Sequence, residues 1–440
     1  MLPLSFLSSS LSLLLISGYS ALPTSAERIS TGGKPKVATA WFTGWHGKNA
    51  TPVFGVDDVS WEKYTRMTYA FAETTPDPSV LNLTGSNPDL LPSFVEEAHK
   101  NNVTAAISIG GWTGSRFWSS SIATPTNRTT FIQTLLSLVS TYNLDGLDFD
   151  WEYPNLQGLG CNVLNPNDTS NFLLFLDELR SDPVGSKLEL SAAVAIRPFI
   201  GPDGVTPLED VSAFAKHLDY IAIMNYDIWG SWSSAVGPNA PLNDTCVSDP
   251  ATEQQGSAVS AVKAWNQAGF PLDQIVLGVA SYGHSFVVNQ TDAFESGSTS
   301  ELAAYPRFNA TAFPAGDSWD DPSGLVDPCG VVQHAGGNYD FWALIEQGLL
   351  NEDGSPNPEV PYRFDECSQT AYVYDSTKEL MISFDDATAF AAKGNFISNL
   401  GLAGFSMWEV GGDLDDILLD SIRSAAGFDD EECEEIYVSQ

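Results

Sequence analysis

The chain has 440 residues, and its 43% hydrophobic and 11% aromatic content is enough for an extended core and excludes wholesale disorder. Its 19 basic and 56 acidic residues give a formal net charge of −37. Nucleic acids and anionic membranes are poor electrostatic partners for such a chain, and we expect it to bind neither.

The N-terminal segment is typical of a secretory signal peptide. Its apolar centre, 11–16, is followed by small residues between 18 and 26 and is shorter than the about 20 residues that a membrane-spanning helix needs. We therefore expect residues 1–26 to be removed and the protein to be secreted, with an uncleaved membrane anchor as the alternative. Asparagines in Asn-x-Ser/Thr sequons support secretion and predict surface glycans; they are Asn49, Asn82, Asn102, Asn127, Asn167, Asn243, Asn289 and Asn309.

Short apolar segments alternate with helical ones along the chain. The predicted strands are 37–42, 67–72, 104–109, 146–151, 188–194, 220–224, 275–279 and 402–408. The predicted helices between them include 93–101, 131–142, 169–180, 211–217, 252–268 and 388–398. This alternation predicts an α/β fold with a parallel sheet, and eight such strands predict a closed (β/α)8 TIM barrel.

The regular spacing is interrupted once, between 284 and 380, where the chain is rich in Gly, Pro and polar residues and contains a short aromatic strand at 372–374. We expect a small α+β insertion domain after the seventh strand that forms one wall of a cleft. After the signal peptide, we expect the first part of the catalytic barrel at 30–283 and the insertion domain at 284–380. The last part of the barrel is expected at 381–427 and an acidic tail at 428–440.

The five cysteines lack the spacing of a metal site, and we expect neither a metal nor a cofactor. In an oxidising compartment four of them are expected to form disulfides. Proximity in the predicted architecture favours Cys161 with Cys246 and Cys329 with Cys367, which leaves Cys433 in the acidic tail.

The segment 145–152, Asp-Gly-Leu-Asp-Phe-Asp-Trp-Glu, contains the candidate catalytic acids. Side chains alternate along a strand, so Asp148, Asp150 and Glu152 share one face, whereas Asp145 has the opposite parity and is expected to be structural. A parallel strand is covered on both faces, and three neighbouring acids there repel one another. The last of them, Glu152, should therefore have a raised pKa and act as a general acid.

Aromatic and polar residues follow the other strands at the barrel end where active sites lie. Tyr226 and Asp227 end the sixth strand, Trp408 ends the eighth, and Trp112 follows the third. Indole faces stack on sugar rings while polar groups bind hydroxyls, so this set suits a carbohydrate. No convincing phosphate loop, zinc motif or Ser/His/Asp arrangement competes with this interpretation.

The chain resembles the secreted fungal chitinases of glycoside hydrolase family 18. The matching motifs are Ser-Ile-Gly-Gly at 108–111, the acidic segment at 145–152 and Met-Asn-Tyr-Asp at 224–227, and the resemblance runs from about 37 to 427. It implies a chitinase that hydrolyses the β-1,4-N-acetylglucosamine linkages of chitin and chito-oligosaccharides by a retaining, substrate-assisted mechanism. It also implies catalytic roles for Glu152, Asp150, Asp148 and Tyr226. The substrate-binding residues expected from it are Asp227, Trp408, Trp112, Tyr69, Met224, Trp45 and Tyr153.

Several assignments stay open at this stage. Packing is as good an explanation as sugar stacking for Trp45, Trp112, Trp229 and Trp232, and Phe71 is expected to line the core. His284 stands where relatives often carry Arg and receives no role, and Arg197 reaches either a sugar or a surface ion pair. The alternative functions are an endo-β-N-acetylglucosaminidase and a chitin-binding lectin. We expect a monomer, with exo-acting or processive cleavage as a hypothesis that follows from the insertion.

Overall fold

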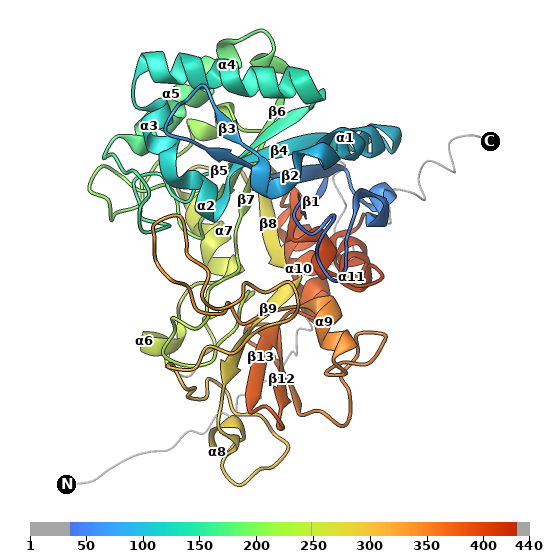
Figure 1. The fold of residues 1–440 in the computed structure, drawn as a ribbon. Helices are drawn as coiled ribbons and strands as arrows, with labels where there is room; N and C mark the ends of the chain where they lie inside the picture. The colour runs from blue at the N-terminus through green and yellow to red at the C-terminus, as the bar shows by residue number, and fades with distance from the viewer. Residues whose placement is uncertain (1–35, 248, 429–440) are drawn as a thin grey trace, which may run out of the picture. The chain divides into compact units, whose positions relative to one another are not determined.

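The computed structural model describes residues 36–247 and 249–428. The expected signal segment, 1–26, and Cys433 of the tail lie outside the described residues. Within them, parallel strands form a closed ring, because β1 pairs with both β2 and β14 (Figure 1). The ring strands are β1 (Val37–Thr43), β2 (Arg66–Thr74), β4 (Thr104–Gly110), β5 (Gly146–Asp150), β6 (Glu189–Val194), β7 (Tyr220–Ile223), β8 (Ile275–Ala280) and β14 (Gly404–Trp408). The predicted TIM barrel is confirmed.

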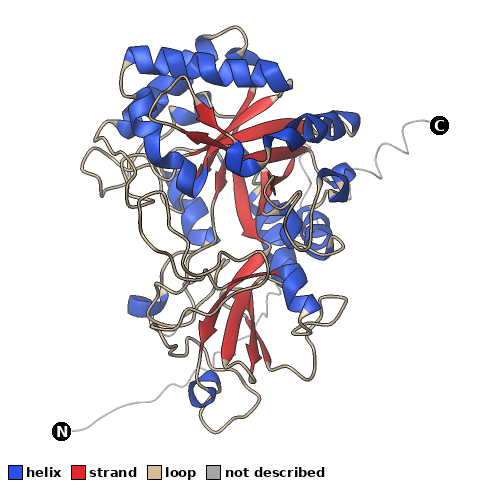
Figure 2. Ribbon diagram, in the orientation of Figure 1, coloured by secondary structure: helices blue, strands red, loops and turns tan. Residues whose placement is uncertain are grey.

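Helices cover the outside of this ring (Figure 2). The two ends of α4 follow from sequence: the Thr124 hydroxyl accepts the Asn127 N–H, Pro125 begins the first turn, and Asn143 ends the helix with φ of 56°. The helices of the barrel are α1 (Leu91–Lys100), α2 (Gly111–Gly114), α3 (Trp118–Ile122), α4 (Pro125–Tyr142), α5 (Asp168–Ser181), α6 (Pro250–Glu253), α7 (Ala258–Gln267), α10 (Ala387–Leu400) and α11 (Ile417–Ala426). None of the described helices is long and apolar enough to cross a membrane.

Two helix predictions need correction. The predicted helix at 211–217 is wrong: the segment holds one 3-10 turn, Phe214–Lys216. Its backbone N–H groups bond to the third residue back, Phe214 to Val211 and His217 to Phe214. The predicted helix at 252–268 is divided in two. Ser257 has extended backbone angles and caps α7 through its hydroxyl, so the longer part begins only at Ala258.

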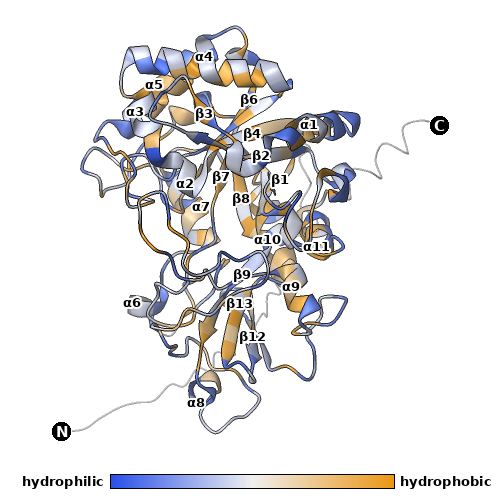
Figure 3. Cartoon of the chain, in the orientation of Figure 1, coloured by the Kyte–Doolittle hydropathy of each residue, from blue (hydrophilic) through white to orange (hydrophobic). Residues whose placement is uncertain are grey.

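Side-chain alternation along the ring strands separates the core from the barrel interior. Leu147 and Phe149 of β5 point outward into the apolar layer under the helices, where Trp118 packs against Phe149 at 5.9 Å and against Trp151 at 5.5 Å. Inward positions of neighbouring strands carry small residues such as Ala193 and Ala222. The apolar composition of β8 is visible in Figure 3. The interior therefore has room for the carboxylates of β5.

A second, antiparallel sheet follows β8 with the order β10-β9-β13-β12-β11 (Figure 1). Its members are β9 (Tyr282–Val287), β10 (Asn338–Asp340), β11 (Tyr362–Asp365), β12 (Thr370–Asp375) and β13 (Leu380–Phe384), with α8 (Gln290–Ala293) and α9 (Phe341–Glu346) in the connections. Phe286, Tyr374 and Met381 form its own small core. The predicted α+β insertion after the seventh ring strand is therefore present.

A buried ion pair lies at the junction between the end of this insertion and α10. Lys393 of α10 contacts Asp385, which directly follows β13, and the side chains are 0% and 1% exposed. Burial raises the pKa of Asp385 to about 6 although Lys393 opposes the shift. The next residue, Asp386, caps α10 by accepting the Ala389 N–H at 2.9 Å. The junction thus depends on matched charges in a dry environment.

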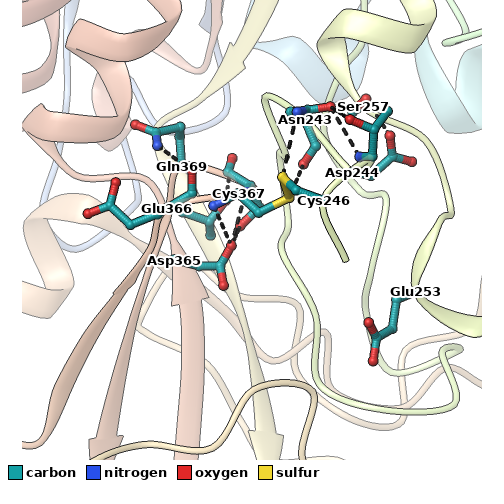
Figure 4. The surroundings of a disulfide bond; sticks show 12 residues. Asn243, Asp244, Cys246, Glu253, Ser257, Asp365, Glu366, Cys367 and Gln369 are labelled. Atoms are coloured by element: carbon teal, nitrogen blue, oxygen red, sulfur yellow. Dashed lines mark hydrogen bonds between the residues drawn. A yellow bond between two sulfur atoms is a disulfide. The ribbon is translucent and has the colours of Figure 1, made fainter. Parts of the chain in front are cut away.

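The disulfides differ from the expected pairing. Cys161 is bonded to Cys329, and Cys246 is bonded to Cys367. Each bond joins a loop of the barrel to the insertion, whereas the predicted Cys329–Cys367 bond would have stayed inside the insertion. The expectation failed because the β7–α7 loop packs on the β11–β12 turn, which brings Cys246 to Cys367 (Figure 4).

The other bond is made by the insertion hairpin, which we define as residues 320–338. A short hairpin inside it is closed by the Gly324 N–H to Gln333 carbonyl bond at 2.9 Å and by the Gln333 N–H to Leu325 carbonyl bond at 2.7 Å. Cys329 lies at its turn and reaches Cys161 in the loop after β5. The spacing of the cysteines in the sequence predicts neither of these two disulfide pairings.

Candidate active site

Asp148 lies at the bottom of the barrel cleft and is held by three neutral donors. The Ser191 hydroxyl donates to Oδ1 at 2.6 Å, and the Ser108 hydroxyl and the Trp41 indole N–H donate to Oδ2 at 2.7 and 3.1 Å. Burial raises the pKa of Asp148 although these donors favour its charged form. Asp148 therefore has a fixed orientation behind the next carboxylate.

Asp150 is also buried, but its Oδ1 has no hydrogen-bond partner among the described residues. Burial, followed by the charges of Glu152 and Asp148, raises the pKa of Asp150 well above its ordinary value. A buried acceptor without a donor is costly in a resting protein. Asp150 is thus prepared to accept a hydrogen bond from a group that enters the cleft.

Glu152 lies just beyond the end of β5, and its backbone is fixed on both sides. Its N–H donates to the Ser115 hydroxyl at 3.0 Å, and its carbonyl accepts from the Asn162 side-chain amide at 2.9 Å. Burial raises the pKa of Glu152 to about 7; a hydrogen bond with Tyr153 opposes the shift, and the charge of Asp227 adds to it. Glu152 can therefore hold a proton near neutral pH. The direction of the shift is as expected, but its causes are burial and Asp227 rather than repulsion by the two acids of β5.

Asp227 faces the cleft with a side chain that is 50% exposed. Its Oδ1 accepts hydrogen bonds from the Tyr282 hydroxyl and from His284 Nε2, each at 2.7 Å, and its own N–H donates to the Asn239 side chain at 2.9 Å. Burial acts to raise the pKa of Asp227, but the bonds from His284 and Tyr282 outweigh it and the pKa is lowered. Asp227 therefore stays negative and acts on Glu152 as a fixed charge.

The cleft extends on both sides of these acids. A hollow of about 590 Å³ is lined by Trp45, Phe71, Trp112 and Trp408, and another of about 410 Å³ by Tyr153, Trp229 and Trp232. Both are also lined by Glu152, Met224, Tyr226 and Asp227. Glu152 thus lies between two aromatic hollows.

Trp408 closes the barrel below this cleft. Its indole stacks on Phe71, with centroids 5.5 Å apart and planes inclined by 17°, and it contacts Trp41 at 5.9 Å. Trp41 is the same residue that donates to Asp148. The aromatic floor and the acidic strand are therefore one connected structure.

The structure contradicts the expectation that Tyr69 binds substrate. Tyr69 is 0% exposed, packs against Phe42 and Phe94, and donates its hydroxyl to the backbone carbonyls of Ser86 and Asn87. It therefore points away from the cleft. Phe71, which we expected in the core, lines the cleft instead.

The structure also gives the positions of the other residues that were singled out from the sequence. Trp45, Trp112, Trp408, Met224, Tyr226 and Asp227 line the cleft together with Tyr153, and Trp112 is 50% exposed. Trp232 is 62% exposed and meets the ring of His284 edge-on at 5.4 Å. Asp145 lies at the other end of β5, where its carboxylate accepts from His99 at 2.8 Å and from the Ala105 N–H at 2.9 Å.

Sequence reasoning assigned no role to several residues of the site. Trp41, Ser108 and Ser191 hold Asp148, and each lies at an inward position of its own strand, a parity that the sequence does contain. The insertion contributes Asp321 and Asn338 to the cleft wall. No sequence signal marks those two residues, because a long loop carries no periodicity.

This (β/α)8 barrel has two acids on one strand and a third just beyond its end, inside an aromatic cleft. It has the architecture of a glycoside hydrolase. The family model described as "Glycosyl hydrolases family 18" matches residues 38–413, and the chain belongs to this family.

Two curated relatives are similar over most of their length, and both are named chitinase-like effectors. The protein from Moniliophthora perniciosa is 54% identical over 392 residues, which are 89% of this chain and 87% of the relative. The protein from Moniliophthora roreri is 52% identical over 89% of this chain and 93% of the relative. Among solved structures, the Rhizomucor miehei chitinase RmChi1 matches with a TM-score of 0.78 and 30% identity, over 89% of this chain and 100% of that one.

Proposed function

We propose that this protein is a secreted chitinase that hydrolyses β-1,4-N-acetylglucosamine linkages with retention, through an oxazolinium intermediate. The observation that carries the proposal is Glu152, which has a pKa near 7 and lies between two aromatic hollows of one cleft. A group protonated near neutrality and placed midway along a cleft suits protonation of a bond inside a bound chain.

In the first step Glu152 gives its proton to the glycosidic oxygen, and the bond from that oxygen to the anomeric carbon breaks. The acetamide carbonyl oxygen of the same sugar attacks that carbon and forms the oxazolinium ring. Asp150 accepts the acetamide N–H through its unpartnered Oδ1 and stabilises the positive charge that develops. The substrate thus supplies the nucleophile that a second carboxylate supplies in other retaining enzymes.

In the second step Glu152, now ionised, takes a proton from water, and the resulting hydroxide equivalent opens the ring from the face that the leaving group vacated. Two inversions give net retention. Asp148 is fixed by three donors, and its charge helps to raise the pKa of Asp150. Glu152 therefore transfers the proton, while Asp150 and Asp148 of β5 support the reacting sugar from behind it.

The surrounding residues fix the reacting sugar. Trp408 is the floor under its ring, Tyr226 donates its hydroxyl to the acetamide, and Asp227 accepts from sugar hydroxyls. Binding energy gained at Trp45 and Trp112 holds the rest of the chain in the cleft. This arrangement requires an N-acetyl group on the sugar that reacts.

Two relatives reported above are named chitinase-like effectors rather than chitinases, so we also consider a second candidate. This candidate is a protein that uses the same cleft to bind chito-oligosaccharides without cleaving them. Such a protein needs the aromatic cleft but not the acid. The intact series Asp148, Asp150 and Glu152 favours the enzyme. The two candidates share one ligand and differ only in turnover.

The test compares wild type, Glu152→Gln and the exposed control Glu359→Gln on soluble N-acetylglucosamine oligomers, with product anomers followed by NMR at early times. Fresh β-anomer from wild type and control, and none from Glu152→Gln, is the expected result. Saturable binding without turnover in all three proteins would establish the binding protein. Neither binding nor turnover would reject both candidates and direct attention to glycoprotein glycans.

A further inference from the structure

A separate cavity of about 770 Å³ lies where four segments meet, and neither the acids of β5 nor Glu152 line it. Phe54 comes from the loop between β1 and β2, Trp342 and Glu346 come from α9, and Asp415 comes from the loop after β14. Trp319, at the base of the insertion hairpin, completes the wall. The cavity is larger than either hollow beside Glu152.

The aromatic wall of this cavity is held rigidly. Trp319 stacks on His46 with centroids 3.8 Å apart, and its indole N–H donates to the Pro52 carbonyl at 2.9 Å. A Cβ atom added to Gly411 would lie 2.9 Å from both Phe54 and Trp319, so the backbone beneath the rings is in close contact with them. These rings therefore form a fixed surface, which lowers the entropic cost of binding a flat ligand.

Trp342 adds a polar group without a partner. Its side chain is 6% exposed and lines the cavity, and its indole N–H has no acceptor among the described residues. Its ring meets Trp319 at 5.3 Å with planes inclined by 64°. A buried indole N–H usually has an acceptor, so this donor marks a place for an oxygen from outside the chain.

The polar lining of the cavity is acidic, and none of its described lining residues is Lys, Arg or His. Two of its acids already have partners within the protein. Asp413 accepts backbone N–H groups at the start of α11, and Asp416 pairs with Lys63 at 2.9 Å. Glu346 and Asp415 are exposed, and neither side chain forms a hydrogen bond or ion pair with another described residue. The rim thus offers uncompensated negative charge beside an aromatic wall.

We infer that this cavity binds glucosamine units of partly deacetylated chitin. The apolar face of the sugar ring packs on Trp319, the protonated amine lies near Glu346 and Asp415, and a hydroxyl oxygen accepts from Trp342. An N-acetylated unit has no positive charge and would leave the two carboxylates uncompensated. The amine and ring chemistry follow from the cavity, whereas the assignment to the same polymer as the substrate rests on the proposed function.

The test uses a fully deacetylated glucosamine oligomer and the full-length protein, with binding followed by calorimetry at mildly acidic pH and low ionic strength. The oligomer lacks the acetamide that the proposed mechanism requires, so its binding is measured without turnover. The variant Glu346→Gln with Asp415→Asn should bind about fivefold more weakly than wild type, as expected for two exposed charge contacts. The matched control, Glu96→Gln with Asp273→Asn, changes the net charge equally in α1 and before β8 and should bind as wild type does.

Trp319→Ala is the second variant and should bind at least about tenfold more weakly, with a thermal unfolding scan to verify that it is folded. Absent binding by wild type, or equal losses in the control and the cavity variant, would overturn the inference. A third readout adds an N-acetylated oligomer to Glu152→Gln. Displacement of the glucosamine oligomer would place it in the catalytic cleft and overturn the inference, whereas simultaneous binding supports it whether or not the protein hydrolyses chitin.

Discussion

Replacing Glu152 with Gln should make the protein more stable at neutral pH as well as inactive. The pKa of Glu152 is raised from 4.5 to about 7 in the folded protein, chiefly by burial. Below 4.5 the carboxyl is protonated in the folded and unfolded states alike, and it has no effect on the free energy of unfolding. Between 4.5 and 7 the unfolded state has lost this proton while the folded state still holds it, so the free energy of unfolding falls as the pH rises through that range. The full cost of about 3 kcal/mol is reached above 7. Glutamine fills the same space without charge and avoids that cost.

Urea unfolding measures the difference directly, at one pH below 4.5 and at another above 7. The Gln variant should exceed wild type by up to about 3 kcal/mol at the higher pH and by almost nothing at the lower one. The exposed control Glu359→Gln should match wild type at both. A Gln variant that is no more stable than wild type at the higher pH, or equally stabilised at both, would refute the reasoning from burial.

Three other perturbations follow from the same structure. Asp227→Asn removes a charge that helps to raise the pKa of Glu152, so the alkaline limb of the kcat/KM profile should move to lower pH; an unmoved limb would show that burial alone sets it. Lys393→Met leaves Asp385 buried without a partner, so it should lower the free energy of unfolding, measured in urea, by about 3 kcal/mol or more. The double variant Lys393→Met, Asp385→Leu should recover most of this loss. No recovery would contradict the ion-pair explanation. Cys161→Ser with Cys329→Ser should lower the free energy of unfolding by about 3 kcal/mol, and a difference that persists in reducing agent would contradict a disulfide effect.

The acidic strand shows why part of the site could be predicted. Strand alternation is a local rule, and β5 follows it without interruption, so the shared face of Asp148 and Asp150 could be inferred from the sequence. The same rule failed on β2. The pairing of β2 with β4 changes register between Tyr69 and Ala72, and Tyr69 and Phe71 consequently face different environments. A register change depends on the partner strand and leaves no mark in the spacing of residues.

Contacts between segments that are distant in the sequence could not be predicted from it. His284 could be noticed as a departure from relatives, but its bond to Asp227 depends on how β9 meets the end of β7. The disulfide partners depend in the same way on which loops of the barrel touch the insertion. Local patterns therefore predicted the strands and the acid, and tertiary packing determined what surrounds them.

The two disulfides also affect how the protein withstands proteases. Cys161 and Cys329 are 168 residues apart in sequence, and Cys246 and Cys367 are 121 apart. The two covalent loops overlap, so every residue between 161 and 367 lies inside at least one of them. The exposed hairpin segment with Val326 and Val332 is an accessible place for cleavage. A cut at Val326 breaks the backbone but leaves the two pieces joined through both bridges. A nicked molecule of this kind keeps its barrel and insertion covalently joined, and the cut is revealed only when the disulfides are reduced.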